Sequence, residues 1–212
     1  MNARPPSEAD LSSILISRVC HDLVSPIGAV VNGIDLVREL GGADVDAELA
    51  MISQSSDRAS ALLKYYRIAF GDAPEDSAIA RGTLRDQAAA FLGSGRIVID
   101  WPDDGGPALP RPAARLLFLL LMSARVLAGM RGTLFVSLPP DTDMPMQVRV
   151  EGELSPDAPE MLSHLTGDAG ETEVTPRLVE FVLARIRAAG LGAALEIARG
   201  DGSVTIRAAR PA

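Results

Sequence analysis

The residues best suited to chemistry in this sequence are a histidine and the aspartate that follows it, His21 and Asp22. An imidazole is largely uncharged at neutral pH, so a ring nitrogen can attack an electrophile or carry a proton. A neighbouring carboxylate can orient the ring and help to manage its proton. The pair predicts nucleophilic or acid–base chemistry at His21, whereas a histidine taken at random on an amphipathic helix is more often an ordinary solvated side chain.

The segment from about Leu11 to Leu40 predicts a long helix that displays His21. Turning each residue by about 100° gathers an apolar stripe, made of Ile16, Val19, Leu23, Ile27, Val30, Ile34 and Val37. On the far side His21 is surrounded by Ser17, Arg18, Ser25, Gly28, Asn32 and Asp35. We expect a partner protein to dock on this polar strip, chiefly through Ser17, Arg18, Gly28 and Asn32.

A proline and a glycine after His21 add to this prediction. Pro26 follows five residues later, where it removes a backbone hydrogen bond and is expected to bend the helix. Gly28 and Ala29 have small side chains, so they leave room for another protein to approach the next helical turn closely.

The run Cys20-His21-Asp22-Leu23-Val24-Ser25-Pro26 resembles the phosphoacceptor box of two-component histidine kinases. With the rest of the chain considered, the sequence is most similar to the ChpT-type histidine phosphotransferases, which join the kinase hairpin to a degenerate ATP-binding domain. The resemblance implies that His21 accepts a phosphoryl group from the receiver aspartate of a hybrid histidine kinase. It also implies transfer to response regulators of the cell cycle, with Asp22 orienting the ring.

The first helix is expected to end at Gly41-Gly42, and Asp44 or Asp46 to cap a second one. Apolar residues of the second helix recur at helical spacing, namely Val45, Leu49, Ile52, Ala59, Leu62, Leu63 and Tyr66. Two helices bury little by themselves. We therefore expect residues 8–72 to be an antiparallel hairpin that dimerises into a four-helix bundle, giving a homodimer.

The segment 71–77 is polar and contains a helix breaker, so it predicts a domain boundary. Beyond it helices and strands alternate. Helices are expected at 83–91, 112–127, 159–165 and 176–189, and strands at 96–101, 133–138, 146–151, 195–198 and 203–208. The fold class predicted is α+β, in which residues 77–212 form an α/β sandwich resembling a degenerate histidine-kinase ATP-binding domain.

Three parts of the nucleotide site of those kinases are replaced in this chain. Leu119 and Ser123 occupy the helix positions that resemble the kinases' asparagine platform for magnesium and phosphate. The run Glu151-Gly152-Glu153-Leu154-Ser155-Pro156 has one of the expected glycines and a displaced acid, and a proline, Pro176, stands where a glycine-rich lid is expected. We expect no ATP and no cofactor of its own, with Mg²⁺ supplied by the partner receiver domain.

Composition bounds the remaining function classes. The 212 residues are 47% hydrophobic and 23% charged, which is globular composition, and the formal net charge of -8 disfavours nucleic-acid and anionic-membrane partners. The single cysteine, Cys20, cannot form an internal disulfide and is expected to be a small core residue, and His164 is expected at the surface or a helix end. We expect a cytoplasmic protein without a membrane anchor.

Three alternatives remain open from the sequence. The protein could be an ATP-using kinase core with unorthodox ligands, or a dimeric scaffold that holds a receiver without accepting phosphate. Ser25 lies one turn after His21, where related kinases place a residue that assists receiver dephosphorylation. A net phosphatase role for Ser25, supported by Pro26, is therefore the third alternative.

Overall fold

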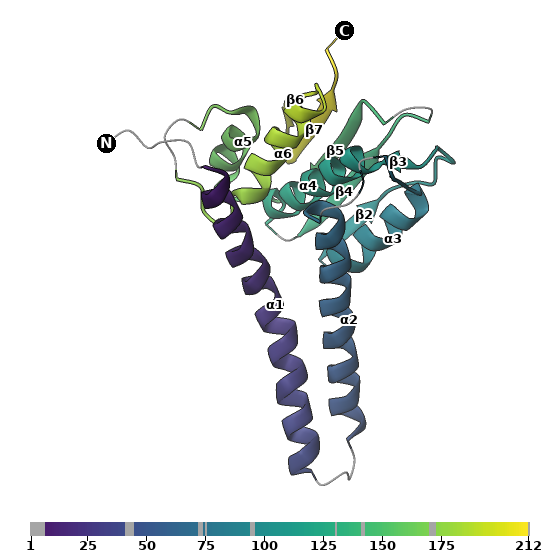
Figure 1. Cartoon of the computed structure of the whole chain (residues 1–212), viewed down its shortest axis with the longest axis vertical. Helices are drawn as coiled ribbons and strands as arrows, with labels where there is room; N and C mark the ends of the chain where they lie inside the picture. Colours follow the sequence, from purple (N-terminus) through teal and green to yellow (C-terminus); the bar gives the residue numbers. More distant parts are fainter. Residues whose placement is uncertain are drawn as a thin grey trace.

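The computed structural model describes residues 7–40, 45–71, 74, 76–93, 96–129, 131–140, 143–169 and 173–211. Two long antiparallel helices, α1 (Glu8–Glu39) and α2 (Asp46–Ala69), project from an α/β body that holds the rest of the chain (Figure 1). Ser7 caps α1 reciprocally with Asp10, because the Ser7 hydroxyl accepts from the Asp10 backbone amide and the Asp10 carboxylate accepts from that of Ser7. This capping box starts the helix earlier than Leu11.

The predicted hairpin is confirmed, with differences at its turn. Gly41, Gly42 and Asp44 lie outside the described residues. Asp46 is the first residue of α2 rather than its cap, since Val45 stands at the cap position and makes no side-chain capping bond. α1 continues through Pro26, which is buried.

The α/β body is built on a five-stranded sheet of order β2-β4-β5-β7-β6. Its strands are β2 (Ile97–Asp100), β4 (Gly132–Ser137), β5 (Met146–Glu151), β6 (Ala194–Gly200) and β7 (Ser203–Ala209). β2 runs parallel to β4, and every other neighbouring pair is antiparallel. The helices are α3 (Arg81–Leu92), α4 (Arg111–Leu127), α5 (Ala158–Thr166) and α6 (Val179–Gly190). The predicted α+β class is therefore confirmed.

Three details depart from the sequence prediction. α3 begins at Arg81, with Ala80 at the cap position, whereas the sequence predicts a helix from 83 that Thr83 could cap. α6 begins at Val179, three residues after the expected Pro176. Two short strands, β1 (Ala78–Ile79) and β3 (Leu109–Pro110), pair antiparallel and were not expected, since two residues are too few to show a strand pattern.

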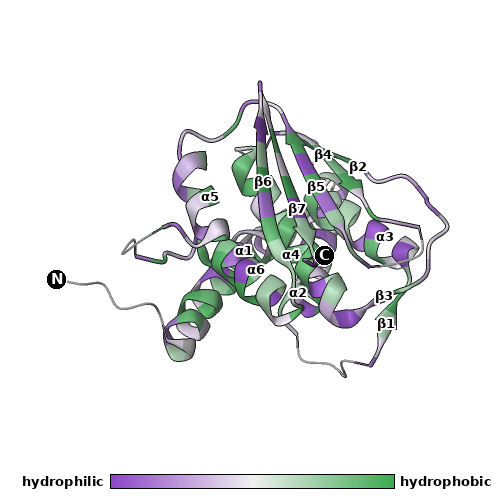
Figure 2. Ribbon diagram, turned by 90° about the horizontal axis from the view of Figure 1, so that it is seen from above, coloured by the Kyte–Doolittle hydropathy of each residue, from purple (hydrophilic) through white to green (hydrophobic). Residues whose placement is uncertain are grey.

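The core lies between the sheet and the helices on one of its faces (Figure 2). Side chains of β5 and β7 alternate between buried and half-buried, so that Val148 and its partner Ile206 both point into the core. α4 is buried along almost its whole length, from Ala113 to Leu127. α4 is therefore enclosed at the centre of the domain, together with its buried arginines Arg115 and Arg125.

The C-terminal part of α2 belongs to the same core. Its residues Leu62, Tyr65 and Tyr66 are buried, and the Tyr65 hydroxyl donates to the Phe118 carbonyl of α4 at 2.7 Å. The Tyr65 ring also packs on Phe91 of α3, with 4.6 Å between ring centroids. The hydrophobic core therefore runs across the boundary expected at 71–77 and fixes the hairpin against the α/β body.

Both hairpin helices leave apolar side chains in contact with solvent along their length. The large exposed ones are Ile16, Val24, Ile27, Val31, Ile34, Leu36 and Leu40 on α1, and Leu49 and Leu63 on α2. By length and hydropathy, residues 9–39 form the one helix among the described residues that could cross a bilayer. That is weak support for a membrane span, because a helix of a soluble bundle meets the same criterion and this one also carries ion pairs to the α/β body.

A close approach between α1 and α2 gives a stability prediction. A Cβ on Gly33 would stand 2.5 Å from Ile52 Cγ1, whereas one on Gly28 would have no described heavy atom within 4 Å. We expect Gly28→Ala to raise the free energy of unfolding by about 0.5–1 kcal/mol through helix propensity. Gly33→Ala should lower it, because overpacking costs about 1–3 kcal/mol. Urea denaturation followed by circular dichroism measures both, and equal stabilisation by the two variants would contradict this packing.

Candidate functional site

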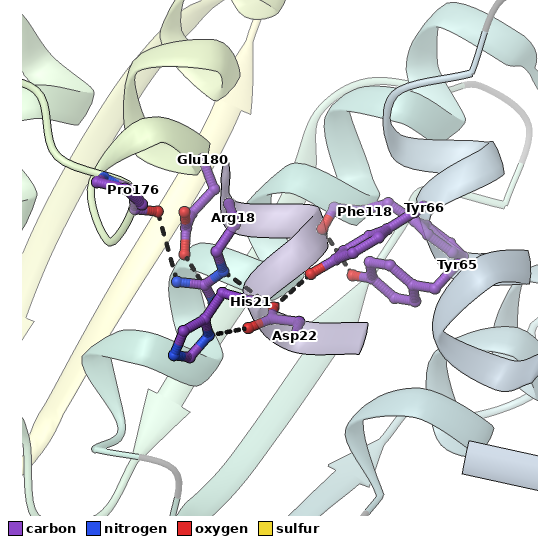
Figure 3. A network of polar contacts seen from close by, with 8 residues as sticks. All are labelled: Arg18, His21, Asp22, Tyr65, Tyr66, Phe118, Pro176 and Glu180. Atoms are coloured by element: carbon purple, nitrogen blue, oxygen red, sulfur yellow. Dashed lines mark hydrogen bonds and ion pairs between the residues drawn. The ribbon is translucent and has the colours of Figure 1, made fainter. Parts of the chain in front are cut away.

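His21 is displayed on α1 with its ring turned to solvent (Figure 3). Its side chain is 84% exposed, while that of Asp22 is 20% exposed. The His21 Nδ1 lies 3.0 Å from Asp22 Oδ1. An ionised carboxylate only accepts hydrogen bonds, so the ring nitrogen facing it must carry the proton. This contact leaves Nε2 with its lone pair on the open side of the ring.

Asp22 is held by two further groups, from α2 and from the preceding turn of α1. Its Oδ2 accepts from the Tyr66 hydroxyl at 2.5 Å and from Arg18 Nε at 3.0 Å. Burial opposes ionisation of Asp22, but the hydrogen bonds from Tyr66 and His21 and the charge of Arg18 outweigh it and lower the pKa of this carboxyl. Burial and the Asp22 carboxylate raise the pKa of Tyr66. Asp22 is therefore an ionised, fixed acceptor.

Arg18 joins α1 to the α/β body. Its Nη2 lies 3.7 Å from Oε1 of Glu180 in α6, and its Nη1 donates to the Pro176 carbonyl at 3.5 Å. The Arg18 side chain is only 18% exposed. The expectation that Arg18 lines a solvent-facing docking strip is therefore wrong, because its guanidinium is directed at Asp22 and Glu180.

Glu180 is a part of this network that the sequence analysis did not find. Its side chain is 0% exposed, and burial, partly offset by Arg18, raises its pKa to about 7. The signal that could have revealed it is an acid within the apolar run Leu178-Val179-Glu180-Phe181-Val182. Tyr66 was expected only as a core residue, and its hydroxyl has the additional role of holding Asp22.

The other residues of the expected strip fall into two groups. Ser17, Ser25 and Asn32 are exposed, as His21 is, and Gly28 is half-buried. Pro26 is buried, so its side chain cannot contact a partner. It affects the site only through the backbone of α1, from which it removes a hydrogen bond.

Two isolated residues differ from expectation. Cys20, expected to be a small core residue, is exposed. His164, expected at the surface or at a helix end, does lie in the last turn of α5 but is buried, with 3% exposure. Burial lowers the pKa of His164. An imidazole buried in this way cannot reach another protein, so His21 is the accessible histidine.

The bond from Tyr66 to Asp22 generates a test of the network. Tyr66→Phe should lower the free energy of unfolding at pH 7 by roughly 1.5–3 kcal/mol, because a hydrogen bond to a charged group is lost. The depressed pKa of Asp22 stabilises the fold above the ordinary titration range of this carboxyl. The difference in free energy of unfolding between the wild type and Tyr66→Phe should therefore narrow below about pH 4. Urea denaturation at several pH values measures it.

Tyr65→Phe is the matched control, since that hydroxyl bonds to the Phe118 carbonyl and not to Asp22. For this control, the difference in free energy of unfolding from the wild type should not change with pH. A difference for Tyr66→Phe that also stays constant with pH would show that Tyr66 does not stabilise the ionised form of Asp22.

Known proteins resemble the chain over both its hairpin and its α/β body. The family model described as the histidine phosphotransferase C-terminal domain matches residues 81–203, which is more than half of the chain. The protein phosphotransferase ChpT of Brucella abortus (strain 2308) is 34% identical over 176 residues, covering 82% of this chain and 83% of that protein. A bacterial phosphotransferase with a solved structure at 1.7 Å is 27% identical, with a TM-score of 0.80 over 98% of this chain and 100% of that one. The chain therefore belongs to the histidine phosphotransferase family.

Proposed function

We propose that this histidine phosphotransferase takes a phosphoryl group from the receiver aspartate of a hybrid histidine kinase onto His21 and passes it to the aspartate of a response regulator. The observation that carries the proposal is the geometry of one ring. The His21 side chain is 84% exposed, and Asp22 holds its Nδ1 at 3.0 Å. The opposite nitrogen, Nε2, is the one that a second protein can reach.

The transfer uses His21 as the nucleophile and Asp22 as the group that holds its proton. The Nε2 lone pair forms a P–N bond while the P–O bond of the aspartyl phosphate breaks, and its electron pair returns to the receiver carboxylate. The ring gains positive charge in this step, and the ionised Asp22 faces the Nδ1 proton that shares that charge. Onward transfer is the same reaction reversed on a second receiver.

The partner supplies the rest of the chemistry in this proposal. Phosphoryl transfer depends mainly on in-line positioning and charge neutralisation. We assign the Mg²⁺ and a lysine for this purpose to the acidic pocket of the receiver domain, and we propose no cofactor for the chain itself.

The proposal excludes ATP as a phosphoryl donor. Leu119 and Ser123, at the positions that resemble the kinases' asparagine platform, are 1% and 0% exposed in the core of α4. Arg177 also bonds Asp157 and the Ser155 hydroxyl, tying the segment before α6 to the segment before α5. Side chains buried at the two platform positions, and a segment before α6 that is bonded to Asp157 and Ser155, support the proposal that the body does not bind a nucleotide.

We further propose that two copies form a homodimer in the cytoplasm. The apolar side chains exposed on the hairpin, such as Ile27, Ile34 and Leu49, are 51%, 39% and 50% exposed. Pairing with a second hairpin into a four-helix bundle would bury them. A net charge of -8 and a single cysteine fit a cytoplasmic protein whose partners are proteins rather than nucleic acid or membrane.

Transfer from a receiver tests the assignment of His21. A receiver domain carrying radiolabelled aspartyl phosphate should pass acid-labile label to the wild type and none to His21→Gln. The control is His164→Gln, which changes the chain's second histidine, a buried one, and should keep full labelling. Label that survives His21→Gln would contradict the proposal.

The same assay separates the alternatives. A docking scaffold would leave the wild type unlabelled while still binding the receiver. Release of inorganic phosphate from the receiver that is faster with the wild type and is markedly lost in Ser25→Ala would instead assign phosphatase action to Ser25, which is exposed one turn after His21. Labelling from ATP with Mg²⁺ in the absence of any receiver would identify an ATP-using kinase.

The dimer proposal gives a separate prediction. Changing Ile27 and Ile34 together to Glu should convert a dimer to a monomer, because the charges would enter the buried face of the bundle. Sedimentation equilibrium measures the mass. The control is Val98→Glu, on the sheet and 59% exposed, which should remain dimeric. A wild type with the mass of one chain would contradict the proposal.

A further inference from the structure

Glu180 is a buried acid that faces the phosphoacceptor helix from the α/β body. It lies in the first turn of α6, and its side chain is 0% exposed. The carboxylate is directed at Arg18, with 3.7 Å between Oε1 and Nη2 (Figure 3). Neither oxygen has a hydrogen-bond partner among the described residues. Arg18 is thus its main connection to α1.

A continuous series of contacts leads from Glu180 to the reacting ring. Arg18, which faces Glu180, lies 3.0 Å from Asp22 through Nε. Asp22 in turn lies 3.0 Å from His21 Nδ1. The series crosses from α6 to α1, and exposure rises along it from the fully buried Glu180 through the half-buried Arg18 and Asp22 to the exposed His21.

Other charged and titratable groups surround Glu180. Arg18 contacts it from α1, the charges of Asp22 on α1 and of Arg125 on α4 also affect its pKa, and its own charge helps to raise the pKa of Tyr65 on α2. Arg125 is buried and stacks on the Phe91 ring at 4.9 Å. Two cations and two carboxylates therefore share this buried region, and the state of one carboxyl decides whether their charges balance.

We propose that Glu180 is a positioning residue for His21, acting through Arg18 to set how firmly Asp22 holds the imidazole. This inference rests on the proposed function of His21 as the phosphoryl carrier. It gives the α/β body a direct part in the transfer, beyond that of a scaffold.

The physical basis is competition for one guanidinium. When Glu180 is ionised, both carboxylates attract the Arg18 guanidinium. Arg18 then neutralises Asp22 less completely, and Asp22 interacts more strongly with the His21 ring. That charge matters most as Nε2 forms the P–N bond and the ring becomes cationic. When Glu180 is neutral, Asp22 is the remaining close carboxylate for Arg18 and is drawn away from His21.

Both states of Glu180 are accessible near neutral pH, because burial raises its pKa to about 7. A carboxyl whose pKa is raised by folding makes its full contribution to stability only below its ordinary value, here 4.5, and loses that contribution as the pH rises to the folded value of about 7. An ionised Glu180 therefore costs stability above about pH 7. Since a neutral glutamine would avoid that cost, a role in the site accounts for the acid better than packing does.

The experiment compares Glu180→Gln with the wild type in transfer from a phosphorylated receiver over a range of pH. Below about pH 6 both proteins carry a neutral side chain at this position, so their rates should agree. At about pH 8 the variant should be roughly fivefold slower, a typical size for coupling between two sites. Taking the ratio of the two rates cancels any pH dependence that the receiver contributes equally to both measurements.

The matched control is Glu160→Gln, since Glu160 also lies in the first turn of a helix but is exposed. Its rate ratio should stay near one at every pH. A ratio for Glu180→Gln that is constant with pH, whether or not it equals one, would overturn the proposal, because lost packing does not depend on ionisation.

A double-mutant cycle tests the route through Arg18. In an Arg18→Met background, Glu180→Gln should have no further effect, and additive effects would overturn the route. Chemical phosphorylation of His21 by phosphoramidate repeats both measurements without a receiver. A wild type that takes phosphate from phosphoramidate but not from receivers would contradict the proposed function, while the pH-dependent ratio would still decide the role of Glu180. Failure of His21 to react with either donor would overturn both.

Discussion

The structure depends on one carboxylate that is held from three sides. Asp22 accepts from Tyr66 of α2 and from Arg18 of its own helix, and its second oxygen faces the ring of His21. Because these bonds fix the carboxylate before any partner arrives, the imidazole is oriented without being buried. An exposed imidazole with a partly buried support combines access for another protein with a defined geometry.

The shared core explains how a hairpin can keep this geometry. Tyr65 and Tyr66 are neighbours in α2 with different hydroxyl partners, since one bonds α4 through the Phe118 carbonyl and the other bonds Asp22 in α1. Both rings also pack near Phe91 of α3. A rotation of the hairpin against the body would break the Tyr65 bond to Phe118 and both ring contacts to Phe91, so these contacts hold α2, and with it the Tyr66 hydroxyl, in place beside Asp22.

Much of the fold follows from local patterns. The helical periodicity of the first two helices and the apolar or β-rich runs of the α/β body predict the order and type of the main elements. Local patterns failed where a signal was short or where the expected capping residue did not stand at the cap position, and the Ser7 cap of α1 was not among the predictions. The two-residue strands β1 and β3, the start of α3 and the place of Asp46 are examples.

The sequence by itself determined that His21 lies on the polar side of an amphipathic helix beside an acid, because helical periodicity and adjacency are properties of the chain alone. Only the tertiary structure decided which residues hold that acid. Tyr66 is 44 residues from Asp22, and Glu180 lies far beyond it in another part of the fold. It also decided that Arg18 turns inward and that His164 is buried. Contacts between distant elements depend on how the helices pack. Periodicity along one helix shows which side faces inward, but it does not show which residues of other elements that side contacts.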